Sequence, residues 1–172
     1  TLIAGAVLLG RVEWTRADGG AFEAALVQGA VPQERKWDGD EQQAILARYR
    51  RLSRDHLDAP VIIWPETAVP VFADQLEGAL GPLFAAAERQ GTTVLTGIPE
   101  RRWQDGEKHY FNSVVTRGAG GGELYLKRHL VPFGEYVPLR ELLFFAEKFV
   151  PGEGRFVPGR DPSPLAVDGG RA

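Results

Sequence analysis

The chain has 172 residues, of which 44% are hydrophobic and 25% are charged, and its formal net charge is −3. This length and composition fit one globular domain and exclude a disordered tail. The slightly negative charge lacks the basic surface that binding to nucleic acid requires, so we expect no nucleic-acid partner. The sequence contains no cysteine, which excludes disulfides, thiolate metal sites and a thiol nucleophile within these residues. The three histidines, His56, His109 and His129, lack the i, i+4 spacing of a helical metal site, and we expect neither a metal nor a cofactor.

The first ten residues are all apolar or small, and Arg11 ends this run. A bilayer span needs about 20 such residues, so the run cannot cross a membrane by itself. We interpret residues 1–12 as the end of a transmembrane helix, with Arg11 and Trp14 at the membrane interface. A buried strand or helix, or a piece of a signal peptide, would show the same pattern. Residues 13–23, which include a Gly-Gly pair, are then predicted to be a linker.

A strand pattern and a helix pattern come next. The apolar run Ala24–Gln28, closed by a glycine and a proline, predicts a first buried strand. Between residues 40 and 56, apolar residues recur four and three positions apart from Ile45 onward, with charges on the other faces. This spacing predicts an amphipathic helix that is capped near Asp38 or Asp40.

The same alternation continues to residue 90. Val61–Trp64 is continuously apolar after a proline, which predicts a central strand that is buried on both faces. Apolar residues between Leu76 and Ala87 outline a second helix. Gly81-Pro82 lies inside that pattern, so we expect the helix to kink or to restart there.

Three further strands are predicted before residue 127. Thr93–Gly97 and Phe111–Thr116 are each predicted to be a strand, with Asp105-Gly106 in the turn between them. The glycine-rich stretch Gly118–Gly122 connects the second of these strands to Leu124–Leu126, which ends at a lysine.

The last part of the chain is richer in proline and glycine. Leu139–Val150 predicts a helix, residues 151–164 predict a loop, and Leu165-Ala166-Val167 opens another strand. The complete order, in which strands alternate with helices before a hairpin, predicts an α/β fold with helices packed on a sheet.

Two opposite charges follow predicted strands. Glu66 comes directly after Trp64-Pro65, and Lys127 follows Leu124–Leu126, so both belong at the rim where α/β sheets carry their chemistry. Glu135 lies eight residues after Lys127 and is a possible partner for it. Ordinary structural roles would explain the same residues: a first-turn helix position for Glu66, a solvated rim position for Lys127, and a surface ion pair for Glu135.

Longer motifs around these residues resemble a known family. The stretches are Trp64-Pro65-Glu66-Thr67-Ala68 and Lys127-Arg128-His129-Leu130-Val131-Pro132-Phe133-Gly134-Glu135-Tyr136-Val137-Pro138, with Leu26-Val27-Gln28-Gly29, Pro32, Lys36-Trp37, Thr96-Gly97-Ile98 and Tyr110-Phe111-Asn112-Ser113 in the same order. They resemble the carbon-nitrogen hydrolase (nitrilase) superfamily, and more closely its membrane-bound branch, the apolipoprotein N-acyltransferases. The resemblance covers residues 24 to 138, and the long lysine motif is its most specific part.

This resemblance implies a nitrilase-like αββα sandwich with a Glu, Lys, Cys triad. Glu66 matches the general base, Lys127 the lysine, Glu135 a further glutamate beside the site, and Trp37 a substrate-binding aromatic on a loop near the entrance. The third member of such a triad is a cysteine that follows a later strand. We therefore expect residues 24–172 to be an incomplete domain of this type that ends before the cysteine, and the chain alone to be inactive.

The resemblance also implies an activity and a location. The enzyme would move an acyl chain from a phospholipid donor, through a cysteine thioester, to the N-terminal diacylglyceryl-cysteine of an apolipoprotein acceptor. Both substrates lie in the membrane, which favours the transmembrane interpretation of residues 1–12, with the catalytic domain on the periplasmic side of the bacterial inner membrane. Two alternatives stay open: a soluble nitrilase-type amidase that uses the same triad with water, and a non-catalytic module that keeps the fold.

Overall fold

The computed structural model describes residues 9–15, 21, 23–32, 35–36, 38–104, 106–132, 134–136, 156–167 and 170–171. Trp37 and the predicted helix Leu139–Val150 lie outside these residues, as do most of residues 1–12 and of the predicted linker. Within the described ranges, no helix combines the length and the apolar character that a membrane crossing requires.

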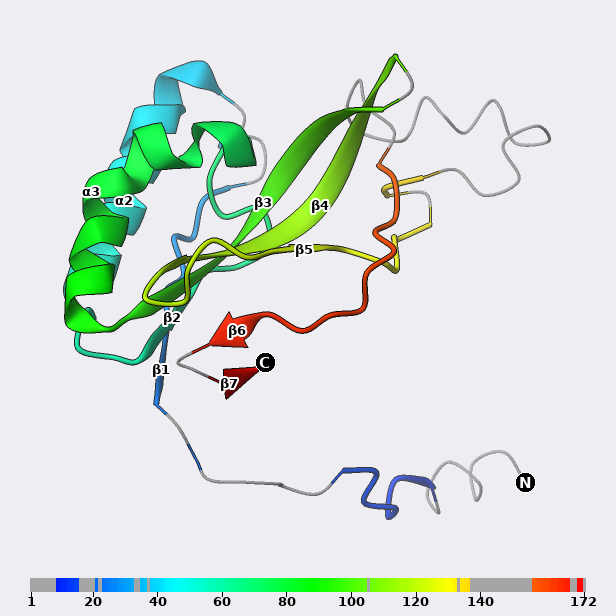
Figure 1. Cartoon of the computed structure of the whole chain (residues 1–172), viewed down its shortest axis with the longest axis horizontal. Helices are drawn as coiled ribbons and strands as arrows, with labels where there is room; N and C mark the ends of the chain where they lie inside the picture. Colours follow the sequence, from blue (N-terminus) through cyan, green and yellow to red (C-terminus); the bar gives the residue numbers. More distant parts are fainter. Residues whose placement is uncertain are drawn as a thin grey trace.

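Five strands form one mixed sheet, in the spatial order β1-β2-β3-β4-β5. Their bounds are β1 (Ala24–Leu26), β2 (Val61–Ile63), β3 (Thr93–Gln104), β4 (Glu107–Gly118) and β5 (Leu124–Leu126). β1, β2 and β3 are parallel, whereas β4 is antiparallel to both β3 and β5. β5 therefore runs in the same direction as β2, and the residues that follow these two strands leave the sheet at the same end (Figure 1). β6 (Ala166–Val167) and β7 (Gly170–Arg171) form a separate antiparallel pair, which confirms a strand near residue 165.

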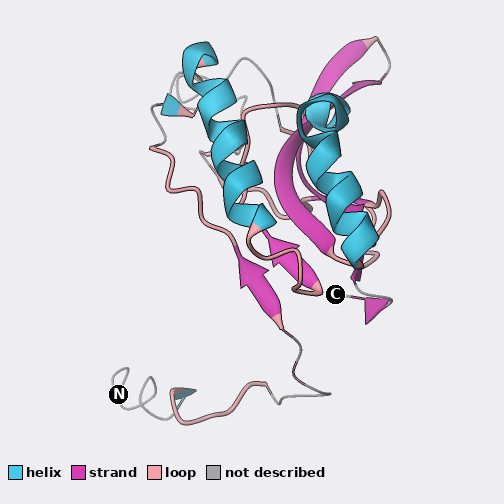
Figure 2. Cartoon of the chain, turned by 90° about the vertical axis from the view of Figure 1, so that its left-hand side faces the viewer, coloured by secondary structure: helices cyan, strands magenta, loops and turns pink. Residues whose placement is uncertain are grey.

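Helices α2 (Gly39–Arg54) and α3 (Leu76–Gln90) lie side by side on one face of the sheet, and the short 3-10 helix η2 (Ala73–Gln75) leads into α3 (Figures 1 and 2). The sequence left Asp38 and Asp40 open as the cap of α2. Asp38 is the N-cap, and its side chain accepts a hydrogen bond from the backbone N–H of Asp40 at 3.0 Å. α3 ends at Gly91, whose φ of 76° is a conformation that glycine adopts without strain.

The expected restart at Pro82 is wrong, because α3 continues through that residue as one helix. A proline removes one hydrogen bond from a helix interior. Leu80, Leu83 and Phe84 are each at most 3% exposed where α3 packs on the sheet, and this burial offsets the lost bond.

Two strand predictions also need correction. β3 and β4 are each 12 residues long. Their hairpin continues in register past Pro99 until Gln104 pairs with Glu107, through polar residues that carry no apolar signal.

β1 is not a buried strand: it pairs only with β2 among the described strands, and Leu26 is 77% exposed. An apolar run indicates a strand, but it does not show that other elements cover both faces of that strand.

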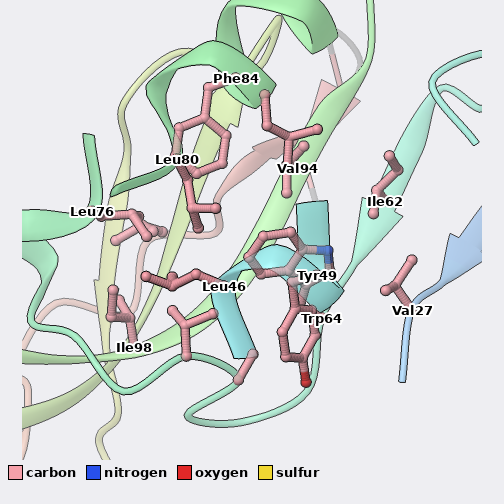
Figure 3. Packing of buried hydrophobic residues seen from close by; sticks show 14 of the residues in the cluster. Val27, Leu46, Tyr49, Ile62, Trp64, Leu76, Leu80, Phe84, Val94 and Ile98 are labelled. Atoms are coloured by element: carbon pink, nitrogen blue, oxygen red, sulfur yellow. The ribbon is translucent and has the colours of Figure 1, made fainter. Parts of the chain in front are cut away.

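The core lies between the sheet and the two helices (Figure 3). Leu76, Leu80 and Phe84 of α3 pack there against Val94 and Ile98 of β3. On the other side of the same core, the rings of Tyr49 and Trp64 lie with their centroids 4.7 Å apart. Trp64, the residue that directly precedes Pro65-Glu66, is thus buried in the core.

Candidate active site

The position of Glu66 is set by the anchored residues on both sides of it. Trp64 is 3% exposed; its backbone N–H donates to Leu95 O at 2.9 Å, and its indole N–H donates to Ser53 Oγ at 3.0 Å. Ala68, 1% exposed, donates its N–H to Gly97 O at 3.1 Å. The turn that carries Glu66 is therefore tied to β3 at both ends, and its carboxylate projects from a rigid base.

A glycine makes this path possible. A Cβ atom on Gly97 would lie 2.6 Å from the Cα of Glu66 and 2.8 Å from the backbone N of Thr67, which are backbone atoms that cannot swing away. Only a residue without a side chain lets the turn lie so close to β3. Thr67 has a φ of 49°, which is unusual for a β-branched residue and places backbone strain next to Glu66.

Lys127 is placed by the edge of the sheet. It follows β5 directly, and its backbone N–H donates to Asn112 O of β4 at 2.7 Å. Leu124, three residues earlier, packs on the core beneath the helices, so the alternation of side chains directs Lys127 to the opposite face. Gly97 alternates with the core residue Ile98 and also belongs to that opposite face, which we call the site face.

On the site face the lysine meets two carboxylates. Lys127 Nζ lies 3.0 Å from Glu66 Oε1 and 3.0 Å from Glu135 Oε1, so one ammonium group donates to both. These contacts join residues that are 61 and 8 positions apart in the sequence. The two carboxylates differ in surroundings: the Glu66 side chain is 64% exposed and that of Glu135 is 11% exposed.

Glu135 is held by a turn as well as by the lysine. The backbone N–H of Val131 donates to Glu135 Oε2 at 2.5 Å, and the N–H of Glu135 donates back to Val131 O at 2.9 Å. The side-chain amide of Asn112 donates to Glu135 Oε1, the oxygen that also faces Lys127. Both carboxylate oxygens are thus occupied, and Glu135 is a fixed part of the site.

These contacts set the charges of Glu135 and Lys127. Burial alone would raise the pKa of Glu135, but the hydrogen bonds from Val131, Lys127 and Asn112, together with the positive charge of Lys127, hold it below the ordinary value of 4.5. Burial alone would lower the pKa of Lys127, but its bonds to Glu135 and Glu66 raise it above the ordinary value of 10.5. At neutral pH Glu135 is therefore an anion and Lys127 a cation.

The structure brings together Glu66 and Lys127, which the sequence placed at one rim, and Glu135, which it gave as a partner of Lys127. Glu66 lies in a turn and not in the first turn of a helix, and Glu135 is not a surface residue. Trp37 lies outside the described residues. The sequence assigned no role to Gly97 or Asn112, although both stand inside the motifs that carried the resemblance, next to Ile98 and Phe111. Their functions depend on contacts with distant segments, which a single sequence does not show.

The arrangement suits proton transfer and charge stabilisation. The exposed carboxylate of Glu66 is placed to accept a proton, and the ammonium group of Lys127 is placed to stabilise a developing negative charge. Among the described residues no group of three or more His, Asp or Glu side chains is placed to hold a metal ion. The catalytic roles of Glu66, Lys127 and Glu135 stay predictions at this point.

Comparison with known proteins gives the class to which this fold and site belong. The sequence pattern of the Carbon-nitrogen hydrolase family matches residues 23–168, and the chain belongs to the carbon-nitrogen hydrolase family. A crystal structure of a carbon-nitrogen hydrolase from Helicobacter pylori superposes with a TM-score of 0.51 at 19% identity, over 86% of this chain and 48% of that one. At this level of identity the likeness shows the fold alone, and it confirms the predicted nitrilase-like α/β class.

The similar curated sequences are more specific. The chain is 43% identical over 145 residues to the apolipoprotein N-acyltransferase of Methylococcus capsulatus, covering 84% of this chain and 28% of that protein. It is 44% identical over 131 residues to the apolipoprotein N-acyltransferase of Pseudomonas aeruginosa, covering 76% of this chain and 25% of that protein. The chain thus spans about a quarter of the length of these relatives.

Proposed function

We propose that the chain supplies the Glu and Lys half of the catalytic site of an apolipoprotein N-acyltransferase. The observation that carries the proposal is the contact of Lys127 Nζ with both Glu66 and Glu135 at 3.0 Å. It is supported by the identity of 43% and 44% to proteins named apolipoprotein N-acyltransferase over most of the chain. Within the family fold, this identity favours the acyltransferase over the soluble amidase and the non-catalytic module.

The proposed reaction has two halves, and its nucleophile is a cysteine outside these 172 residues. Glu66 takes the proton of the thiol, and the sulfur attacks the ester carbonyl of a phospholipid while Lys127 stabilises the oxyanion. The carbon–sulfur bond forms, the carbon–oxygen ester bond breaks, and Glu66 returns its proton to the departing lyso-phospholipid. In the second half the amine of a diacylglyceryl-cysteine attacks the thioester and gives up a proton to Glu66. The amide bond forms, the carbon–sulfur bond breaks, and Glu66 passes that proton to the departing thiolate.

The proposal extends to the parts of the chain that the site does not include. Residues 1–12 are the end of a transmembrane helix, residues 13–23 a linker, and residues 24–172 belong to the catalytic domain. Trp37 contacts the substrate. The catalytic domain lies at the bacterial inner membrane, because both the acyl donor and the lipoprotein acceptor are membrane-bound, and we place it on the periplasmic side.

The test measures the acyl-enzyme in a full-length acyltransferase that carries this chain. Glu66→Gln and Lys127→Ala are each expected to lower the rate of acyl-enzyme formation from a labelled phospholipid by at least about a hundredfold. The thioester is identified by its release with neutral hydroxylamine. Glu88→Gln and Lys108→Ala, which alter the same residue types away from the site, are the matched controls and should react normally.

Normal acyl-enzyme formation in either site variant would overturn the assigned roles. A wild-type protein that forms no thioester from phospholipid, but hydrolyses simple amides with release of ammonia, would favour the amidase instead. A protein without either activity would favour the non-catalytic module.

A further inference from the structure

Among the described residues, Asn112 is the one that donates a hydrogen bond to Glu135 and also accepts one from Lys127. Its side-chain amide donates to Glu135 Oε1, and its backbone carbonyl accepts the N–H of Lys127 at 2.7 Å. The first contact orients the carboxylate, and the second fixes the strand end from which the lysine extends. Asn112 thus connects β4 to the two charged groups that the sequence had related only by their spacing.

The two carboxylates around Lys127 are held very differently. Glu135 receives hydrogen bonds on both oxygens, from Val131 at 2.5 Å on one and from Asn112 and Lys127 on the other. Glu66, 64% exposed, has Lys127 as its one described side-chain partner. A carboxylate that must accept and return a proton needs this freedom, whereas a carboxylate that only balances charge does not.

We propose that Asn112 is a positioning residue: its amide holds Glu135 against Lys127, so that the ammonium group keeps an anionic partner while Glu66 carries a proton. The role assigned to Glu66 here rests on the proposed function. Without a fixed Glu135, protonation of Glu66 would leave the half-buried charge of Lys127 without a carboxylate partner among the described residues.

The first test is independent of catalysis and uses the 172-residue chain. The titration of the Glu135 carboxyl is followed by 13C NMR in the wild type, in Asn112→Ala and in Ser113→Ala. Ser113 is the adjacent residue of β4, and its hydroxyl donates to Ile98 O at 2.5 Å, away from Glu135, so its loss controls for general damage to the strand. We expect the Glu135 midpoint to move upward in Asn112→Ala and to stay in place in Ser113→Ala. An unchanged midpoint in Asn112→Ala, or an equal shift in both variants, would overturn the proposal.

The second test uses Asn112→Asp in the full-length acyltransferase. Two carboxyl groups at this distance retain one proton between them, and the protonated aspartic acid donates to Glu135 as the amide did. We expect the variant to keep most of its rate of acyl-enzyme formation at the acidic end and to lose it as rising pH removes that proton. Asn112→Ala should be slower by roughly ten- to a hundredfold at every pH.

A residue that merely fills space would give the Asp and Ala variants the same rate at every pH, and that result would refute the positioning role. The two tests also separate this inference from the proposed function. If the wild-type protein forms no acyl-enzyme, the proposed function fails, while the titration of Glu135 still decides whether Asn112 holds that carboxylate.

Discussion

The two faces of the sheet are stabilised by different interactions. The helix face is apolar and closed: Leu76, Leu80 and Ile62 are fully buried between the sheet and the two helices (Figure 3). The site face carries a lysine between two carboxylates, and at its edge Leu26 is 77% exposed. Apolar burial holds the domain together on one face, and this leaves the other face free to hold charges at hydrogen-bonding distance.

The difference shows how a small fold supports a polar site. Burial of apolar surface is strong but non-directional, whereas charged hydrogen bonds are directional and costly when one partner is missing. Trp64 connects the apolar core to the charged site, because its ring is part of the core and the residues that follow it form the turn of Glu66. Substitutions in the core should therefore lower stability without changing the activity of the folded molecule, whereas substitutions on the site face should lower activity.

The largest effect on stability is expected on the helix face. Leu80→Ala removes a fully buried side chain and should lower the free energy of unfolding by about 3 kcal/mol, because a cavity remains where α3 meets the sheet. Urea denaturation of the chain measures this loss. Acyl-enzyme formation per folded molecule should stay near normal in the full-length protein; a large loss there would show that the two faces are not independent.

Lys127→Met is expected to affect both stability and activity. It leaves the buried carboxylate of Glu135 without its cation and should cost about 2 kcal/mol of unfolding free energy while abolishing acyl-enzyme formation. Adding Glu135→Gln removes the unpaired charge, so the double variant should regain part of the stability but none of the activity. A double variant that is less stable than Lys127→Met would contradict this account.

Gly97→Ala is expected to move Glu66 without opening the core. The added methyl group would meet the backbone of Glu66 and Thr67, so the turn must shift, at a cost of about 1–2 kcal/mol. A displacement of this kind should slow acyl-enzyme formation by about a hundredfold. Gly78→Ala is the matched control, because its new Cβ has no atom within 4 Å; equal losses in both variants would show that Gly97 has no special role.

The pH dependence of stability should reveal the charge of Glu135. Its pKa is depressed in the folded state, so its contribution is complete above the ordinary value of 4.5 and is lost as the pH falls below that value through the folded-state pKa. Urea denaturation between pH 6 and pH 3 should therefore show a weaker acid dependence in Glu135→Gln than in the wild type. Identical slopes of unfolding free energy against pH in the two proteins would mean that the pKa of Glu135 is the same in the folded and the unfolded state.

The smallest effect is expected for Leu26→Ala, which deletes the same atoms as Leu80→Ala on the opposite face. Leu26 is 77% exposed, so its loss should change the free energy of unfolding by less than about 1 kcal/mol. A cost close to that of Leu80→Ala would show that the side chain is buried in solution by a further layer or partner.

The sequence alone determined the elements with a strong periodic or apolar signal. The spacing from Ile45 onward predicted α2 with a cap near Asp38 or Asp40, the run Val61–Trp64 predicted β2, and the two family motifs predicted Glu66 and Lys127 as site residues. Such features depend on residues that are neighbours in the chain, and a local pattern is enough to predict them. The restart expected at Pro82 was wrong, because burial of the surrounding helix outweighs the local cost of a proline.

The tertiary structure alone settled how distant segments meet. The exposure of Leu26, the length of the β3–β4 hairpin, the close approach of Gly97 to Glu66 and the bond from Asn112 to Glu135 all depend on pairing across strands. An amide or a glycine carries no sign of its partner in the sequence, since the same residue serves equally in a turn or on a surface. The sequence therefore identified the charged residues of the site, whereas only the tertiary structure showed which uncharged residues hold them in place.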